Sequence, residues 1–221
     1  PWDGLPVGRS VTFTNADLPF LKARIPEIDH LTGRFYTWGG QQISANGRSS
    51  DFDVRSVHPD HQFLENTKVV KGRYLDELDI EEHRKVTVIG VPVADFLFRG
   101  ADPLGQWISV GGVPFRVVGV FDDDGGENET RMVYLPISTA QAAFGGYDRV
   151  HQVMFTIGDA SVEESVRIEQ GTTAAVVSVA DDDADFRHVR FLASCCGLSG
   201  AGADRRHAGR ASRPGSMVAG V

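Results

Sequence analysis

The chain has 221 residues, 41% hydrophobic and 24% charged, as expected for a soluble globular protein with one large domain or two small ones. Its net charge of −8 argues against a nucleic-acid-binding protein, because neutralising phosphates requires a basic surface. Both cysteines lie at Cys195 and Cys196, which excludes a disulfide framework and a thiolate metal site in the first 194 residues. We expect neither a secretory signal at Pro1 nor a bilayer-spanning segment, because no apolar run reaches roughly 20 residues.

The first quarter of the chain predicts a helix, a strand and a hairpin. Thr14 or Asn15 can cap the helix, and Pro26 should end it. Its apolar residues are Leu18, Leu21 and Ile25. Residues 31–38 alternate loosely and predict a strand. Asn46-Gly47 stands between two polar–apolar runs and predicts a tight hairpin turn.

The middle of the chain carries the clearest patterns. A short helix is predicted over residues 59–65, and residues 76–84 form a polar connection with a possible helical turn. The run KVTVIG is typical of a buried strand. VPVADFLFRG follows as an amphipathic helix with Val93, Phe96 and Leu97 on one side and Gly100 as its C-terminal cap. Gly111-Gly112 then predicts a second hairpin, because this pair suits a turn with positive φ at both central positions.

The last third begins regularly and then loses its pattern. Residues 131–135 predict a strand, Ser138 is expected to cap a helix through Phe144, and residues 149–157 predict a strand. Another helix should start at Ser161. The final stretch is rich in Gly, Ala, Ser and Arg and should be flexible. This mixture of hairpins and helices indicates an α+β protein.

An acidic cluster in FDDDGGENETRMVYLP is the first candidate for a metal or catalytic site. Its carboxylates are Asp122, Asp123, Asp124, Glu127 and Glu129. A calcium loop of the EF-hand type needs oxygen ligands at positions 1, 3 and 5 and a glycine at position 6. Counted from Asp122, the sixth residue is Glu127, so the pattern fails. We interpret the cluster as a solvated loop between two strands, which keeps the protein soluble or contacts a partner.

Two histidines, His58 and His61, form the second candidate, since Asp60 or Glu65 could complete a metal site with them. Two further histidines, His83 and His151, are isolated. A polar pair at the start of a helix is the simpler interpretation. A metal-assisted hydrolase built on His58, His61 and nearby acids remains an alternative.

Sequence motifs of nucleophilic enzymes and of nucleotide-binding sites are missing or incomplete. The nearest match to a G-x-S-x-G elbow surrounds Ser199 and lacks the last glycine, and Cys195-Cys196 is not a C-x-x-C redox motif. Neither a G-x-G-x-x-G string nor a P-loop occurs. The acids at residues 163–164 and 181–183 fit a helix start and a surface run. The sequence therefore predicts no catalytic, cofactor-binding or metal residues, and a protein that is not an enzyme.

Several short motifs follow one another in the middle of the chain. They are Gly72-Arg73, the strand Val86 to Gly90, Asp102-Pro103 with Gly105, the strand Phe115 to Val120, and Tyr134 with Pro136 and Ser138-Thr139. In this order they resemble the periplasmic core domain of MacB-like (macrolide-exporter-type, FtsX-like) ABC transporter permeases. The resemblance covers residues 10–169, and the acidic residues 179–186 resemble a late connection of such domains. After about residue 170 the sequence departs from the family pattern.

The resemblance implies a porter-like βαβ subdomain with an inserted smaller mixed α/β subdomain. By analogy, residues 1–74 form the first part of the porter-like subdomain and residues 75–146 form the insert. Residues 147–186 complete the porter-like subdomain. Residues 187–221 are expected to be a flexible or divergent tail.

The resemblance also implies a non-catalytic domain on the periplasmic side of the bacterial inner membrane, anchored by transmembrane helices outside this chain. Such a domain transmits ATP-driven conformational change to a substrate or a partner protein. The implied partners are a cytoplasmic ABC ATPase, a second permease copy, and a periplasmic adaptor or lipoprotein. The family's substrates vary, so neither substrate nor direction of transport is implied. The alternative is a free-standing periplasmic or secreted binding module that holds a protein or ligand through the Asn46-Gly47 hairpin or the acidic loop.

Overall fold

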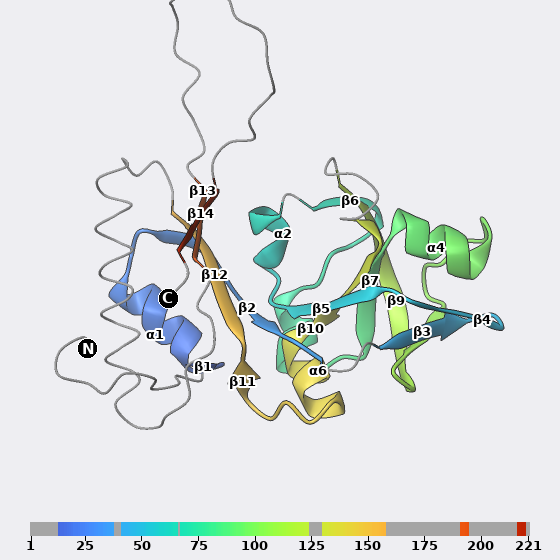
Figure 1. The fold of residues 1–221 in the computed structure, drawn as a ribbon, viewed down its shortest axis with the longest axis horizontal. Helices are drawn as coiled ribbons and strands as arrows, with labels where there is room; N and C mark the ends of the chain where they lie inside the picture. Colours follow the sequence, from blue (N-terminus) through green and yellow to red (C-terminus); the bar gives the residue numbers. More distant parts are fainter. Residues whose placement is uncertain are drawn as a thin grey trace, which may run out of the picture.

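The computed structural model describes residues 13–37, 41–65, 67–123 and 130–157, together with the backbone of two strands at residues 191–194 and 216–219. Within this part, a mixed sheet of ten strands runs through the molecule in the order β12-β2-β5-β10-β7-β9-β8-β3-β4, and β6 pairs with β9 (Figure 1). Short helices pack around the sheet. This is the α+β arrangement predicted from the sequence.

One end of the molecule, called the flank below, contains the first and last described elements of the main body (Figure 1). They are β1 (Phe13–Thr14), α1 (Asp17–Arg24), β2 (Ile28–Phe35), β11 (Arg149–Val150) and β12 (Gln152–Ile157). β2 and β12 are antiparallel, and β1 pairs with β11 in a separate two-stranded ladder. Segments more than 100 residues apart in the sequence are thus neighbours in the flank.

The central sheet contains β5 (Asp53–Val57), β10 (Met132–Pro136), β7 (Val86–Gly90) and β9 (Val113–Asp122). β5 is parallel to β10, β10 is antiparallel to β7, and β7 is parallel to β9. The helices next to it are α2 (His61–Leu64), α3 (Glu77–Glu81), α4 (Val91–Phe98) and α6 (Ile137–Ala143), and β6 (Lys68–Gly72) pairs with the end of β9. The far end of the sheet holds β8 (Trp107–Val110) and the hairpin of β3 (Gln42–Ala45) and β4 (Arg48–Asp51).

Both faces of the central sheet are buried, which explains the continuous apolar runs of β7 and β10. Val133 and Leu135 of β10 belong to the larger core, which includes residues from α1, β2, α4 and β12. Met132 and Tyr134 point to the other face and join a smaller core around Phe121. A strand covered on both faces reads as an uninterrupted hydrophobic run rather than an alternating one.

The two glycine-containing hairpins are confirmed. Asn46 and Gly47 have φ values of 52° and 73°, and Gly111 and Gly112 have 55° and 84°. Positive φ at both central residues is the geometry of the type I′ turn, whose twist matches the flanking strands. Strands 85–90, 131–135 and 149–157 and the helices at 59–65, 76–84 and 91–100 are likewise found, with boundaries shifted by a few residues.

Two predicted helix caps are wrong. Ala16 occupies the N-cap position of α1, and Thr14 instead donates from its backbone and hydroxyl to the Asp17 carboxylate. Pro136 occupies the N-cap of α6, while the Ser138 hydroxyl donates to the Ile80 carbonyl at 2.7 Å. In both places a nearby acceptor competes for the hydroxyl that the sequence pattern assigned to the cap.

Three other expectations need adjustment. The strand expected over residues 31–38 is β2, Ile28–Phe35, and β6 stands in a segment for which no strand was predicted. Arg99 (φ 52°), one residue before Gly100, is the C-cap of α4. The predicted subdomain boundaries at residues 74/75 and 146/147 stay a prediction. β3, which belongs to the first predicted subdomain part, is hydrogen-bonded to β8, which belongs to the predicted insert.

In the C-terminal region, β13 (Phe191–Ser194) and β14 (Ser216–Ala219) form an antiparallel pair near β12 (Figure 1). The predicted helix at Ser161 and the rest of the predicted flexible tail lie outside the described residues. Among the described helices, none combines the length and apolar character needed to cross a membrane.

Candidate functional site

The junction between the flank and the central sheet is narrow. β2 pairs with β12 through six residue pairs, but with β5 through two, Arg34–Val57 and Phe35–Ser56. The backbone ladder alone therefore connects the two parts weakly. The shared hydrophobic core and side chains from the short helix α2 and the turn before it supply additional contacts.

The turn before α2 is fastened to the middle of β2. The His58 amide donates to Thr32 Oγ1 at 3.1 Å, and the Gly33 amide donates to His58 Nδ1 at 3.0 Å. The Leu31 amide donates to Asp60 Oδ2 at 3.0 Å. Two of these bonds join backbone amides of β2 to side chains of the turn, and the third joins a backbone amide of the turn to a side chain of β2. Together they fix α2 over the junction.

A partly buried ionic cluster then crosses from β2 to β5 through Glu65, the residue after α2. Arg34 Nη2 lies 2.8 Å from Glu65 Oε1, and Arg55 Nη1 lies 2.5 Å from Oε2. The Tyr134 hydroxyl of β10 donates to Oε2 at 3.2 Å. The side chains of Arg34, Arg55 and Glu65 are 11%, 18% and 21% exposed. One carboxylate thus joins three strands, and we call Arg34, Arg55, Glu65, His61 and Tyr134 the junction cluster.

His61 is fully buried within this cluster. Its Nε2 lies 2.9 Å from Arg34 Nη2. Because a guanidinium can only donate, Nε2 must be the acceptor, and the proton of the neutral ring is on Nδ1. Burial lowers the pKa of His61 to about 3, and Arg34 and Arg55 favour the neutral form further, against the opposing effect of Glu65.

The other titratable groups of the cluster are also fixed in one protonation state near neutral pH. Burial opposes the charge on Glu65, but the guanidinium groups of Arg34 and Arg55 favour it, and the pKa of Glu65 is held below the ordinary value. Burial and the Glu65 charge raise the pKa of Tyr134 above its ordinary range. General acid–base catalysis works best with a pKa near the operating pH, which none of these groups offers. The arrangement is suited to holding strands together.

His58 and His61 therefore have different surroundings from those a metal site requires. His58 Nδ1 accepts the Gly33 amide, and His61 Nε2 faces a guanidinium, which repels a cation. Asp60 is bound to the backbone of β2, and Glu65 to two arginines. In the part of the chain that the structure describes, no group of three or more His, Cys, Asp or Glu residues is placed to hold a metal ion.

The acidic cluster after residue 121 is described in part. Asp122 is exposed at the end of β9, and its carboxylate accepts the Asp123 amide at 2.9 Å. The remaining acids of the cluster, Asp124, Glu127 and Glu129, lie outside the described residues. So do Cys195, Cys196, Ser199 and the acids at 163–164 and 181–183.

The residues of the family-like motifs have structural contacts. Arg73 binds the fully buried Asp79 with two bonds of 2.6 and 2.9 Å. Asp79 and Asp76 form the capping box of α3. The Thr139 hydroxyl donates to the Arg84 carbonyl at 2.9 Å, which joins α6 to the end of the α3 segment. The Gly-Arg pair with its acidic linker and the motif around Tyr134 therefore build the fold.

Sequence reasoning singled out His61 and Glu65 but missed their partners Arg34 and Arg55. Glu65 follows His61 by four residues, so the spacing shows that these two can meet on one helical turn. Arg34 precedes Glu65 by 31 residues and comes from another element. A single isolated arginine in a strand carries no local signal for such a contact.

Comparison with known proteins gives a consistent picture. A family model described as "MacB-like periplasmic core domain" matches residues 2–181. The macrolide export ATP-binding/permease protein MacB of Azoarcus sp. is 27% identical over 150 residues, which are 66% of this chain and 22% of that protein. The pyoverdine export ATP-binding/permease protein PvdT of Pseudomonas entomophila is 32% identical over 150 residues, which are 65% of this chain and 23% of that protein. The chain spans about a fifth of the length of these relatives.

Two solved structures share the fold. The extracellular domain of the noncanonic ABC-type transporter YknZ from Gram-positive bacteria has a TM-score of 0.66 and 17% identity, with 76% of this chain and 84% of that chain covered. The periplasmic region of MacB from Actinobacillus actinomycetemcomitans has a TM-score of 0.66 and 21% identity, with 78% and 77% covered. At these identities the similarity establishes the arrangement of strands and helices.

Proposed function

This chain belongs to the family of MacB-like periplasmic core domains, and from that membership we propose that it transmits ATP-driven conformational change in an ABC transporter permease and has no catalytic activity of its own. Membership in a family of periplasmic core domains implies an extracytoplasmic location. The relatives are named ATP-binding/permease proteins, which supports an ABC ATPase as the source of the movement.

The observation that carries this proposal is the junction cluster. Movement of the flank can reach the central sheet through two backbone pairs, through the Arg34–Glu65–Arg55 connection and through the hydrophobic core that the two parts share. A rigid buried connection suits the transfer of movement, since a charge pair held by several hydrogen bonds resists displacement more than an exposed pair does. Together with protonation states fixed near neutral pH, this favours a mechanical role over a chemical one.

The proposal includes the remaining partners and the division of the chain. Transmembrane helices outside this sequence would anchor the domain on the periplasmic side of the bacterial inner membrane and connect it to a cytoplasmic ABC ATPase. A second permease copy would form a dimer, with a periplasmic adaptor or lipoprotein as a further partner. The division of the chain into porter-like parts, 1–74 and 147–186, and an insert, 75–146, is also part of the proposal.

Spin labels in the full-length permease test this function. Asp95 is exposed on α4, far from the flank (Figure 1), so Asp95→Cys gives one label per copy on the central part once Cys195, Cys196 and every other cysteine of the permease are replaced by serine. We expect the distance between labels of two copies to differ between the nucleotide-free and ATP-bound permease. With Glu65→Gln added, the ATP-dependent difference should shrink while ATP hydrolysis continues.

The control is Glu82→Gln, which removes an exposed carboxylate paired with Arg84 and should leave the distance change intact. An unchanged label distance on ATP binding would contradict the transmission role. It would favour a binding role, in which the domain holds a protein or ligand without any response to ATP.

A further inference from the structure

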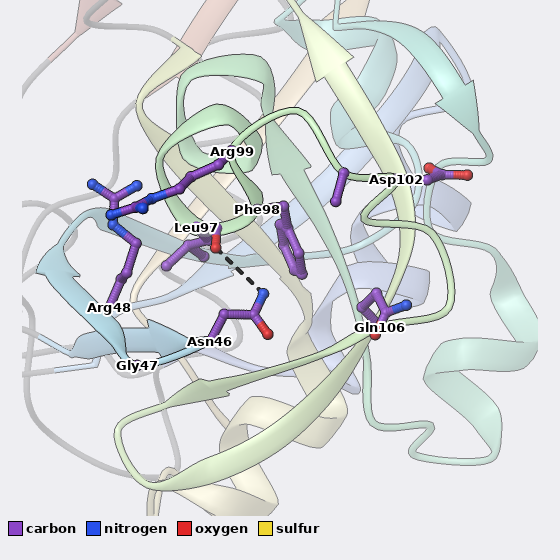
Figure 2. A pocket seen from close by; sticks show the side chains of 9 residues that line it. Asn46, Gly47, Arg48, Leu97, Phe98, Arg99, Asp102 and Gln106 are labelled. Carbon is purple, nitrogen blue, oxygen red and sulfur yellow. Dashed lines mark hydrogen bonds between the residues drawn. The ribbon is translucent and has the colours of Figure 1, made fainter.

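A pocket with a volume of about 540 Å³ lies at the end of the sheet opposite the flank, between the β3–β4 hairpin and the end of α4 (Figure 2). Its walls include Asn46 and Arg48 of the hairpin, Arg99 at the end of α4, and Asp102 and Gln106 from the loop that follows. We call it the hairpin pocket. Ligand sites in proteins typically have volumes of about 300–1,000 Å³, so a small group or a short peptide segment fits here.

The two walls of the pocket are fastened to each other. Asn46 Nδ2 donates to the Leu97 carbonyl at 3.4 Å, shown as the dashed line in Figure 2. Arg48 Nη1 donates to the Phe96 carbonyl, and its guanidinium carbon lies 4.2 Å from the centre of the Phe96 ring. A cation over an aromatic face is attracted by the ring, which orients the guanidinium. These contacts therefore fix the hairpin against α4, the two elements that form the walls of the pocket.

The charge of the pocket is unbalanced. Arg48 and Arg99 enter it from opposite walls, and Figure 2 shows both side chains extending toward the same side. Among the described residues, neither guanidinium forms an ion pair, and the Arg99 guanidinium has no hydrogen-bond partner. The acid of the lining, Asp102, is 67% exposed and lies 4.0 Å from Lys71 instead. Two cations share one concavity in a protein of net charge −8.

We propose that the hairpin pocket binds the carboxylate of an acidic side chain on a segment of a partner protein. Guanidinium groups match carboxylates in plane and donor spacing, and no described residue accepts a hydrogen bond from the Arg99 side chain. The side-chain amides of Asn46 and Gln106 in the same lining can add neutral donors. An anion between Arg48 and Arg99 would also remove the repulsion between like charges.

A carboxylate fits better than a phosphate group. Asp102 contributes a negative charge to the lining, so Arg48, Arg99 and Asp102 together leave one net positive charge, which balances a singly charged carboxylate but not a doubly charged phosphate. Nucleic acids and anionic membrane surfaces present rows of phosphates, which require a broad basic face. The hairpin pocket offers two arginines, enough for one carboxylate at a time.

Titration of the ¹⁵N-labelled 221-residue chain with a blocked peptide tests this proposal. The probe is Gly-Ser-Glu-Glu-Ser-Gly with an acetylated N-terminus and an amidated C-terminus, and its control carries two glutamines instead. We expect the Nε–H signals of Arg48 and Arg99 to shift saturably with the acidic probe and to stay unchanged with the glutamine probe. Inorganic phosphate should bind more weakly than the acidic probe.

Arg99→Gln should weaken binding of the acidic probe about tenfold, since a hydrogen bond to a charged group contributes enough for that factor. Arg24→Gln is the matched control, because Arg24 is also exposed but lies on α1 in the flank, and this variant should bind like the parent. The amide spectrum of each variant shows that it is folded.

Three results would overturn the proposal: no saturable shift of the arginine signals, equal binding of the glutamine probe, or unchanged affinity in the Arg99 variant. Tighter binding of inorganic phosphate than of the acidic probe would overturn the choice of carboxylate. All measurements use the chain by itself, so their outcome does not depend on whether the chain transmits ATP-driven movement.

Discussion

Replacing Glu65 by glutamine tests the junction cluster most directly. Glu65→Gln keeps the size of the side chain and one carbonyl acceptor but removes the charge that neutralises Arg34 and Arg55. Two guanidinium groups, 11% and 18% exposed, would then face each other across a neutral amide. Removing one member of a buried ion pair costs about 3–5 kcal/mol, because the remaining charge stays buried without compensation.

The partial exposure of the cluster places the expected loss at the lower end of that range. Glu65 itself is 21% exposed, so water screens part of the remaining repulsion. We expect the free energy of unfolding to fall by about 3 kcal/mol. For a chain of this size, that corresponds to a decrease in melting temperature of about 6–12 °C.

Urea unfolding followed by circular dichroism measures this change, with Glu82→Gln as the control. Glu82 lies 2.8 Å from Arg84 with side chains 58% and 36% exposed, so its removal should cost less than about 1 kcal/mol. Adding Arg34→Met to Glu65→Gln should recover part of the loss, because it removes one uncompensated charge. If Glu65→Gln and Glu82→Gln unfold at the same urea concentration, the junction cluster contributes no special stability and the reasoning is refuted.

Three further changes have expected outcomes. The pKa of His61 is about 3 in the folded chain, below its value in the unfolded chain. The stability that the neutral, buried His61 contributes is therefore fully present near neutral pH. As the pH falls below about 6.5, the free energy of unfolding decreases by up to about 1.4 kcal/mol per pH unit, because the unfolded chain binds a proton that buried His61 does not. His61→Gln should therefore make the urea midpoint less dependent on pH below about 6.5. Gly119→Ala should lower the free energy of unfolding by about 3 kcal/mol in the same assay, because its Cβ would lie 2.0 Å from the Arg73 carbonyl oxygen. Asn46→Ala should cost about 1 kcal/mol, since alanine tolerates the left-handed φ of 52° less well, and an unchanged urea midpoint would contradict this.

Elements specified by local chemistry could be predicted from the sequence. The turns at Asn46-Gly47 and Gly111-Gly112 have left-handed backbone at two consecutive positions. Few residue pairs adopt this conformation as easily as Asn-Gly and Gly-Gly, so these pairs predict the turns. β7 and β10 were recognisable because a strand buried on both faces has no polar interruption. In each case the information lies within about ten neighbouring residues.

Features that depend on distant partners could not be predicted. β6 reads as a polar segment, and pairing with the end of β9 makes it a strand. The run after Gly47 reads as one strand, yet the structure divides it into β4 and β5, because β5 turns away to pair with β10. Arg34 and Arg55 belong to the junction cluster only because β2 and β5 pair in the sheet. The spacing of residues along the sequence does not reveal this pairing.

The pairing of β2 with β12 determines how tension would pass through the chain. Ile28 begins β2, Ile157 ends β12, and the two residues are partners in the ladder. A pull applied between the segment entering β2 and the segment leaving β12 would open this ladder from one end, pair after pair. Residues 41–146 lie between the two strands in sequence, so they would carry no tension until the ladder had opened. Before the ladder opens, the two strands could tilt together and rotate the central sheet without stretching it.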